Sequence, residues 1–133
     1  AIKHQQKEKL ITTTGVLADI IRRAVPSNYE MRRINPATRT FQALRIYAND
    51  ELGNLEKLLK ALPGVLAEGG RAVIISFHSL EDRLVKNYFK TFEQEGKLKL
   101  LTKKPVTASA EEIENNPRSR SAKLRACSII SSS

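Results

Sequence analysis

Apolar and polar positions follow a helical period in the first part of the chain. Between residues 14 and 24, apolar side chains recur every three or four positions, and the charged residues lie off that stripe. This spacing predicts an amphipathic helix. Thr13 or Thr14 is the expected N-cap, because its hydroxyl can accept a hydrogen bond from an orphan backbone N–H. Residues 27–34 form the expected polar connector after this helix.

A second helical pattern runs from residue 37 to residue 62. Asn35 and Pro36 precede it as the expected N-cap and first helical position, since proline has no N–H to lose there. The pattern fits either one long helix or two helices joined near residues 49–50. Pro63 is expected to interrupt the helix, because its ring clashes with the preceding turn.

The strongest strand signal is the apolar run at residues 71–77, which ends in His78 and Ser79. A β-branched run of this kind is typical of a buried parallel strand. Open α/β sheets bind ligands at the carboxyl ends of such strands. A helix is predicted directly afterwards, over residues 79–92. Ser79 is interpreted as the N-cap of that helix rather than as a nucleophile.

Two weaker strands are predicted further along the chain. One lies at residues 98–101 and the other within residues 117–130, and a short helix capped by Ser109 lies between them. One strong and two weak strands favour an α/β fold, but they are too few to complete a doubly wound sheet. The chain is therefore expected to be part of a larger enzyme.

The charge balance favours a polyanionic partner. The chain has 133 residues, with 23 Lys and Arg against 14 Asp and Glu, a formal net charge of +9. Such an excess favours nucleic acid, although a basic solvated surface has the same balance. The single cysteine, Cys127, excludes an intrachain disulfide and fits a reducing cytoplasm. No apolar run approaches the roughly 18 residues of a membrane span, so no membrane partner is expected.

Four cations near the end of the chain are the first candidates for binding. Arg118, Arg120, Lys123 and Arg125 fall within eight residues, with small residues between most of them. This run fits a strand edge or loop that contacts phosphates. The alternative is a solubilising edge that resists pairing with another strand.

The two helix starts are the other candidates. Backbone N–H groups after Asn35 could receive a phosphate or carboxylate, although ordinary capping explains the same residues. Arg39 follows beyond the first turn and faces either solvent or RNA. His78 either hydrogen-bonds a ligand or satisfies the local backbone; no partner for it can be placed from the sequence.

Several motifs of known chemistry are missing from the sequence. There is no GxGxxG or GxxxxGK(S/T) loop to cradle phosphates, and no GxSxG elbow of a hydrolase. Two histidines and one cysteine at unrelated positions exclude a zinc site of standard spacing. The residues therefore define no cofactor-binding loop, no metal site and no complete catalytic apparatus.

Three long blocks nevertheless form a recognisable pattern: NPATRTFQALRIYANDEL, GGRAVIISFHSLEDRLVKNYF and LTKKPVTASAEEIENNPRSRSAKLR. They closely resemble the MraW-type family, bacterial S-adenosylmethionine-dependent methyltransferases that modify N4 of a cytidine in 16S ribosomal RNA. The opening ITTTGVLADIIRRAVP is similar to that family as well. The resemblance covers essentially the whole chain.

The resemblance implies that this chain is the C-terminal part of a Rossmann-like methyltransferase. Residues 1–34 would be the end of a helical substrate-recognition subdomain, and residues 35–133 the C-terminal part of the methyltransferase domain. The N-terminal half of the family, which holds the residues that bind S-adenosylmethionine, has no counterpart here. The chain alone is therefore expected to be inactive.

The resemblance also implies partners and a substrate pocket. The expected partner is 16S rRNA in the small ribosomal subunit, in the cytoplasm, and the expected pocket residues are Asn35, Arg39, His78 and Ser79. Many family members have His at the position of Asn35, a change that a capping role would survive. The residues leave two other functions open: a non-catalytic basic RNA-binding module, and a structural fragment that self-associates through its incomplete sheet.

Overall fold

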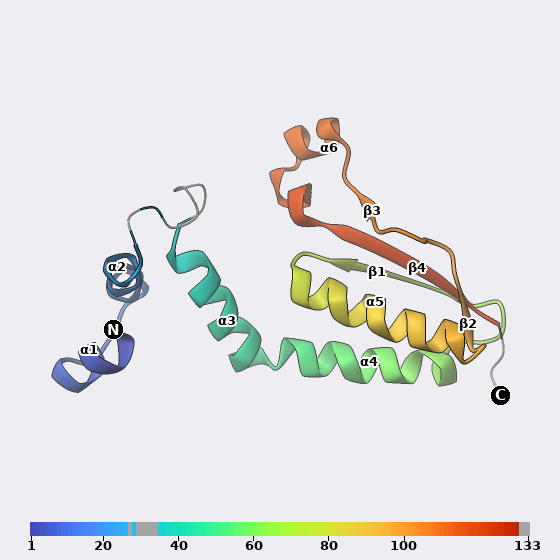
Figure 1. Cartoon of the computed structure of the whole chain (residues 1–133), viewed down its shortest axis with the longest axis horizontal. Coiled ribbons are helices and arrows are strands. Elements are labelled where there is room, and N and C mark those ends of the chain that lie inside the picture. Colours follow the sequence, from blue (N-terminus) through green and yellow to red (C-terminus); the bar gives the residue numbers. More distant parts are fainter. Residues whose placement is uncertain (27, 29–34, 131–133) are drawn as a thin grey trace. The chain divides into compact units, whose positions relative to one another are not determined.

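The computed structural model describes residues 1–26, 28 and 35–130. The chain forms two compact units, Ala1–Glu51 and Leu52–Ser133, which are treated separately below (Figure 1). The expected connector at residues 27–34 lies outside the described residues except for Asn28. The expected functional boundary between residues 34 and 35 stays a prediction.

The described residues of the first unit form three helices, α1 (Ile2–Glu8), α2 (Thr14–Ala24) and α3 (Ala37–Asn49). Thr13 Oγ1 accepts a hydrogen bond from the N–H of Val16 at 3.3 Å, which confirms the predicted cap. Helix α2 packs against α1 and α3. The buried hydrophobic residues in the described part of the first unit are Ile21 of α2 and Ala37 of α3.

Of the two alternatives left open for residues 37–62, the structure has two helices joined near residues 49–50. Helix α3 ends at Asn49, and Asp50 takes left-handed angles of φ 49° and ψ 41° before α4 (Glu51–Val65) begins. Aspartate tolerates this conformation better than most residues do. The two helices are thus separate elements rather than one continuous rod.

The second unit is an α/β unit built on a four-stranded sheet. Its strands are β1 (Arg71–Ser76), β2 (Leu98–Leu100), β3 (Val106–Thr107) and β4 (Lys123–Ile129). Its further helices are α5 (Ser79–Gln94), α6 (Ala110–Asn115) and the 3₁₀ helix η2 (Pro117–Ser121). The three predicted strands are confirmed, and the two-residue β3 is an addition that the sequence pattern did not predict.

The expectation of parallel pairing is wrong for every strand pair that the structure describes. Strand β4 lies between β1 and β2, β3 pairs with the first residues of β4, and all three pairings are antiparallel. The cause is the path of the chain: η2 lies at the carboxyl end of β1, so β4 begins there, with Lys123 opposite Ser76, and runs back. Figure 1 shows β4 beside β1 along its length.

The expected burial of β1 holds for one of its two faces only. Ala72 and Ser76 are buried on the face toward α5, whereas Val73 and Ile75 on the other face are 59% and 52% exposed. Figure 1 shows α4 and α5 on the same side of the strands. The apolar run in the sequence therefore represents one buried face and one apolar face that no described element of this unit covers.

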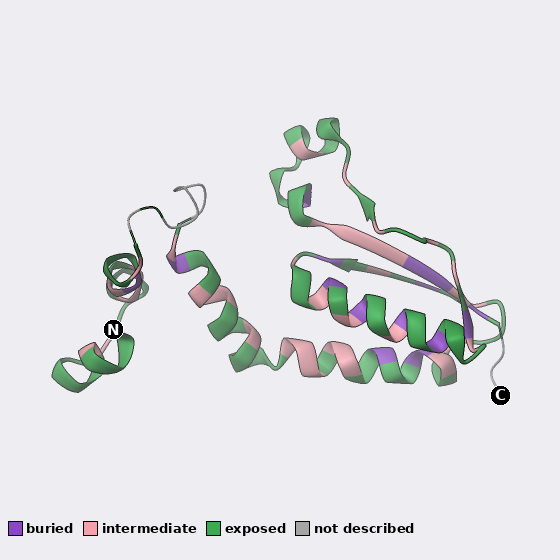
Figure 2. Ribbon diagram, viewed as in Figure 1, coloured by how far each residue is buried: buried purple, intermediate pink, exposed green. Residues whose placement is uncertain are grey.

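The core of the second unit lies between the sheet and the helices α4 and α5 (Figure 2). The Tyr88 hydroxyl donates a hydrogen bond to the Glu56 carboxylate and so joins α5 to α4. The buried residues of this core are Leu59, Leu62, Ala72, Val85, Phe89, Phe92, Leu98, Cys127 and Ile129. Burying several large side chains in one cluster is the main stabilising contribution to such a unit.

Pro63 does not interrupt its helix as expected. Helix α4 continues through Pro63 to Val65, and the N–H of Leu66 still donates to the carbonyl of Leu62. The carbonyl of Leu59 lacks the bond that Pro63 cannot donate, but Leu59 and Leu62 are buried in the core, and their packing holds this part of the helix in place. No helix within the described residues combines the length and the apolar character needed to cross a membrane.

Candidate nucleic-acid interface at the end of β1

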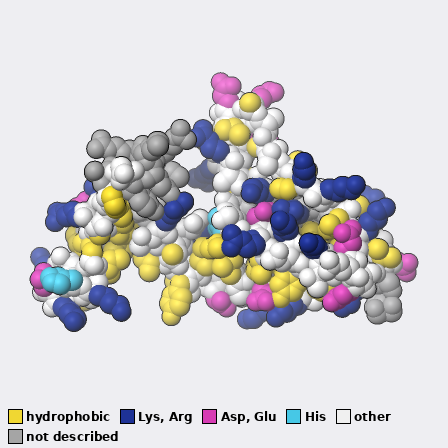
Figure 3. All heavy atoms as spheres, in the orientation of Figure 1, with side chains coloured by type: hydrophobic (Ala, Val, Ile, Leu, Met, Phe, Trp, Pro, Cys, Tyr) yellow, Lys and Arg dark blue, Asp and Glu magenta, His cyan; other side chains and the backbone are white. Residues whose placement is uncertain are grey.

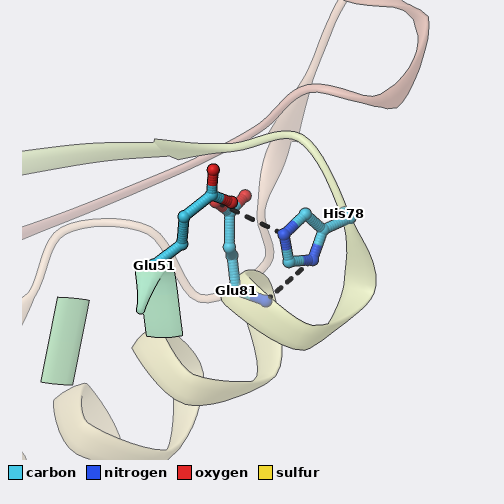
Figure 4. A group of neighbouring side chains, drawn as sticks. All are labelled: Glu51, His78 and Glu81. Atoms are coloured by element: carbon cyan, nitrogen blue, oxygen red, sulfur yellow. Dashed lines mark hydrogen bonds and ion pairs between the residues drawn. The ribbon is translucent and has the colours of Figure 1, made fainter. Parts of the chain in front are cut away.

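The end of β1 and the start of α5 form a reciprocal cap, of which Figure 4 shows the contacts between His78 and Glu81. His78 Nδ1 accepts a hydrogen bond from the N–H of Glu81 at 3.3 Å, and Glu81 Oε2 accepts one from the N–H of Phe77 at 3.0 Å. A capping box exchanges bonds in a similar way, with Ser or Thr at the place that His78 takes here, but its acid accepts from the N–H of the N-cap, whereas Glu81 accepts from the residue before it. The side chains of His78 and Glu81 therefore satisfy two backbone N–H groups at the start of α5 without a residue from another segment.

The predicted capping role of Ser79 is wrong. His78 has the extended angles of an N-cap, φ −144° and ψ 164°, and Ser79 is already the first helical residue. Ser79 is exposed, and its hydroxyl makes no hydrogen bond within the part of the chain that the structure describes. The hydroxyl is thus free to contact a ligand at this edge.

The cap selects one tautomer of the neutral His78 ring. Because Nδ1 accepts a hydrogen bond, the neutral ring carries its proton on Nε2. Nε2 is buried and lies 3.4 Å from Glu81 Oε1, without the alignment of a hydrogen bond. The side chain is only 8% exposed. His78 in this state offers a proton donor and no free lone pair, so it fits a positioning group better than a general base.

An ion pair behind this edge ties β4 to α5. Arg125 Nε and Nη2 donate to the two carboxylate oxygens of Asp82, at 2.7 Å and 3.2 Å. Lys123 Nζ lies 3.9 Å from the same carboxylate. The hydrogen bond from Arg125, reinforced by the positive charges around it, lowers the pKa of Asp82, and burial opposes this effect. Asp82 is therefore ionised at neutral pH, and the guanidinium of Arg125 is engaged inside the protein.

The two arginines of η2 differ from Arg125 in exposure. Arg118 and Arg120 are exposed, and between them Ser119 is buried and its hydroxyl donates to the Asn116 carbonyl at 2.7 Å. This bond anchors η2 and leaves both guanidinium groups at the surface. Since η2 directly precedes β4, these arginines lie at the edge where β1 ends.

Register brings two of the predicted groups together. Ser76, two residues before His78, is paired with Lys123 at the start of β4. The candidate pocket residues His78 and Ser79 and the candidate RNA contacts Arg118, Arg120 and Lys123 therefore belong to one end of the sheet. His78 and Glu81 supply two ligand atoms within this unit, fewer than the three protein ligands of a catalytic zinc.

Asn35 and Arg39 belong to the first unit and are described apart from that edge. Asn35 Oδ1 accepts a hydrogen bond from the N–H of Ala37 at 3.0 Å, and Pro36 already has helical angles, which supports the capping interpretation. Arg39 is exposed on the same helix. Asn35 also lines a hollow of about 430 Å³ between α2 and α3, together with Thr38, Gln42 and Arg45.

The fold and this basic edge define an α/β protein with a helical first unit. The model of the MraW methylase family matches residues 1–130. The chain belongs to that family.

Individual relatives agree with this assignment. The chain is 55% identical to the "Ribosomal RNA small subunit methyltransferase H" of Acidobacterium capsulatum, over 87% of this chain and 39% of that protein. It is 59% identical to the protein of the same name from Koribacter versatilis, over 87% and 37%. It is 52% identical to that from a Wolbachia strain, over 98% and 45%. The chain thus spans about two fifths of the length of these relatives.

Proposed function

We propose that the parent of this chain transfers a methyl group from S-adenosylmethionine to N4 of a cytidine in 16S rRNA. The observation that carries the proposal is the match of residues 1–130 to the MraW methylase family. The names of the relatives, which state a small-subunit rRNA methyltransferase, support the substrate. A ribosomal substrate also favours a cytoplasmic location.

The share of this chain in that function is to position the RNA. The exposed cations Arg118, Arg120 and Lys123 supply charge for backbone phosphates. His78 Nε2–H and the free Ser79 hydroxyl lie at the same end of the sheet and would line the pocket of an unstacked cytidine. Arg125 takes a supporting role instead of an RNA contact, because Asp82 engages its guanidinium.

In the first unit, Asn35 and Arg39 are proposed to belong to the substrate side as well. The support is the hollow between α2 and α3 that Asn35 lines, and the exposure of Arg39 on the same helix. The capping bond of Asn35 leaves the amide nitrogen of its side chain as a donor toward a substrate.

The described residues do not fit S-adenosylmethionine. A cofactor of this kind needs close backbone approach after a strand, but Gly69 precedes β1 and Gly96 follows α5. Two described helices start after a strand: α5 is closed by the cap of His78 and Glu81, and α6 by the cap of Ser109. Each carries two acidic residues in its first turn. We propose that parts of the parent outside residues 1–133 bind the cofactor, and that this chain alone is inactive.

A second function is a basic RNA-binding module without catalysis. The net charge of +9 and the exposed cations of η2 favour it for the chain alone. The module would bind rRNA with a steep salt dependence. It differs from the methyltransferase in that a longer parent would leave the bound rRNA unmethylated.

The test uses the longer parent protein that contains this chain. Purified parent is incubated with small ribosomal subunits and S-adenosylmethionine carrying a labelled methyl group, and the modified nucleotide is located in 16S rRNA by mass spectrometry. Label on N4 of one cytidine is expected. Label on another atom, or RNA binding without any label, would overturn the proposed reaction.

The chain alone is tested by calorimetric titration with S-adenosylmethionine, after circular dichroism has shown that it is folded. No binding is expected. Saturable binding would show that residues 1–133 contain a cofactor site and would contradict the proposed inactivity.

A further inference from the structure

A second basic feature lies on α5, beyond the first turn that follows β1. A groove of about 210 Å³ runs between α5 and the segment that follows β2. Lys86, Lys90 and Glu93 line it from α5, and Thr102 and Lys103 line it from the opposite side. Leu100, Phe89 and Arg125 complete the lining. Figure 3 shows Lys and Arg side chains gathered over this part of the second unit.

The groove carries a net positive charge. Its lysines at positions 86, 90 and 103 face one carboxylate, that of Glu93, whose Oε1 accepts a hydrogen bond from the N–H of Leu100 at 3.2 Å. Arg125 is balanced by Asp82. Lys90 and Lys103 form no ion pair within the described residues. Two ammonium groups therefore lack a protein counter-charge, and an anion entering the groove would supply one.

The chemistry of the lining selects a phosphate over a base. Lysine ammonium groups bind phosphates as point charges. Phe89 is only 1% exposed, so it offers no surface on which a base could stack. The Thr102 hydroxyl accepts a bond from the N–H of Ala126 at 3.0 Å and still has its own proton to donate. Three cations and one hydroxyl donor around a small groove can bind one backbone phosphate and the next phosphate along the RNA strand.

The groove is continuous with the basic edge described above. Asp82 binds Arg125, which lines the groove, and lies 3.9 Å from Lys123 at the start of β4. Lys86 also lies close enough to Asp82 to help lower the pKa of that carboxyl. The cations thus extend from η2 along β4 to α5 within one unit.

We infer that the groove lined by Lys86, Lys90 and Lys103 binds backbone phosphates of the RNA substrate and extends the RNA track beyond the edge of β1. The inference rests on the proposed rRNA substrate, but it concerns binding and not methyl transfer. It assigns affinity to three residues that the reaction itself does not need.

The test measures binding of the 133-residue chain to 16S rRNA by filter binding at several salt concentrations. The triple variant Lys86→Gln/Lys90→Gln/Lys103→Gln removes the three charges. The matched control Lys57→Gln/Arg71→Gln/Lys99→Gln removes three charges from exposed residues of the second unit that do not line the groove, none of which forms an ion pair within the described residues. Circular dichroism checks that each variant is folded.

The groove variant is expected to lower the slope of log affinity against log salt by about 2, since each phosphate contact to single-stranded RNA contributes about 0.7. The control is expected to leave the slope unchanged. The variant Lys86→Arg/Lys90→Arg/Lys103→Arg keeps the charges and is expected to restore binding. Equal slopes in the groove variant and the unmodified chain, or an equal loss in the control, would overturn the inference.

A further comparison separates the inference from the proposed function and from another partner. Loss of rRNA binding in the groove variant supports the groove even if the longer parent methylates no cytidine. Binding of poly-L-glutamate that depends equally on the three lysines would show that the groove recognises an acidic polypeptide as well as it recognises RNA. That result would overturn its assignment to phosphates.

Discussion

Arg125 and Asp82 are 43 positions apart in the sequence, and two hydrogen bonds of 2.7 Å and 3.2 Å join their side chains. Both side chains are 11% exposed. The pair connects the first turn of α5 to β4, between the basic edge and the groove on α5. It therefore supports both proposed RNA-binding surfaces while leaving the contacts themselves to other cations.

Breaking this ion pair should destabilise the second unit. Arg125→Ala leaves the Asp82 carboxylate buried without its main partner, and we expect a loss of roughly 3 kcal/mol in the free energy of unfolding. Urea denaturation followed by circular dichroism measures it. Arg118→Ala removes the same charge from an exposed site and should change the free energy by less than about 0.5 kcal/mol. Equal effects of the two substitutions would contradict the structural role of Arg125.

The same pair predicts a dependence of stability on pH. The hydrogen bond from Arg125 holds the pKa of Asp82 below its usual value of about 3.9. A carboxyl whose pKa is lower in the folded state stabilises the fold above its unfolded pKa, and this contribution is lost as the pH falls through the folded pKa. The difference in unfolding free energy between the unmodified chain and Asp82→Asn should therefore be constant near neutral pH and shrink below about pH 4. A constant difference down to pH 2 would contradict this assignment.

His78 is predicted to have two separable roles. His78→Ala removes the acceptor for the N–H of Glu81 and should cost about 1 kcal/mol of unfolding free energy. His78→Asn keeps a capping acceptor and should recover most of that loss. If His78 also lines the cytidine pocket, both variants of the longer parent should methylate small ribosomal subunits more slowly than the unmodified enzyme.

The comparison of the two His78 variants separates capping from positioning. Full activity in His78→Asn would show that the ring only caps the helix. His4→Ala is the matched control for stability, because His4 is an exposed histidine of α1 whose Nδ1 lies 3.5 Å from Glu8; it should leave the free energy of unfolding unchanged. Asn35→Ala should also lower methylation, and unchanged rates in both Asn35→Ala and His78→Ala would contradict the proposed pocket.

The sequence predicted those elements whose signals are local. Thr13 and Ser109 cap their helices as expected, because an N-cap depends on the residue and the next three positions. The break at Asp50 and the strand at residues 71–76 follow from short patterns as well. The family resemblance was confirmed because long blocks of sequence carried it.

The sequence failed where contacts between distant residues decide. The direction of β1 relative to β4 depends on a pairing across about fifty positions, which periodicity does not contain. His78 caps α5 in place of Ser79 because its ring nitrogen Nδ1 accepts a hydrogen bond from the N–H of Glu81. The groove on α5 was missed because Lys103 comes from a separate segment; the spacing of Lys86 and Lys90 by one helical turn was the only local sign of it.

The uncovered face of β1 predicts that the chain alone self-associates. Val73 and Ile75 are 59% and 52% exposed, and the second edge of β1 has no partner strand among the described residues. Apolar faces and free strand edges favour association with another chain. Sedimentation velocity over a range of concentrations should show a dimer or larger species. Ile75→Lys should weaken association by about tenfold, the loss expected from failing to bury one large aliphatic side chain.

The control for this prediction is Leu58→Lys, which places the same charge at a 51% exposed leucine of α4 in the same unit. Association that falls equally in both variants would reflect net charge rather than the face of β1. A chain that stays monomeric at every concentration would show that the exposed face of β1 does not drive self-association. In the longer parent the prediction reverses: if the remaining part of the protein covers β1, Ile75→Lys should destabilise the parent, whereas Leu58→Lys should not.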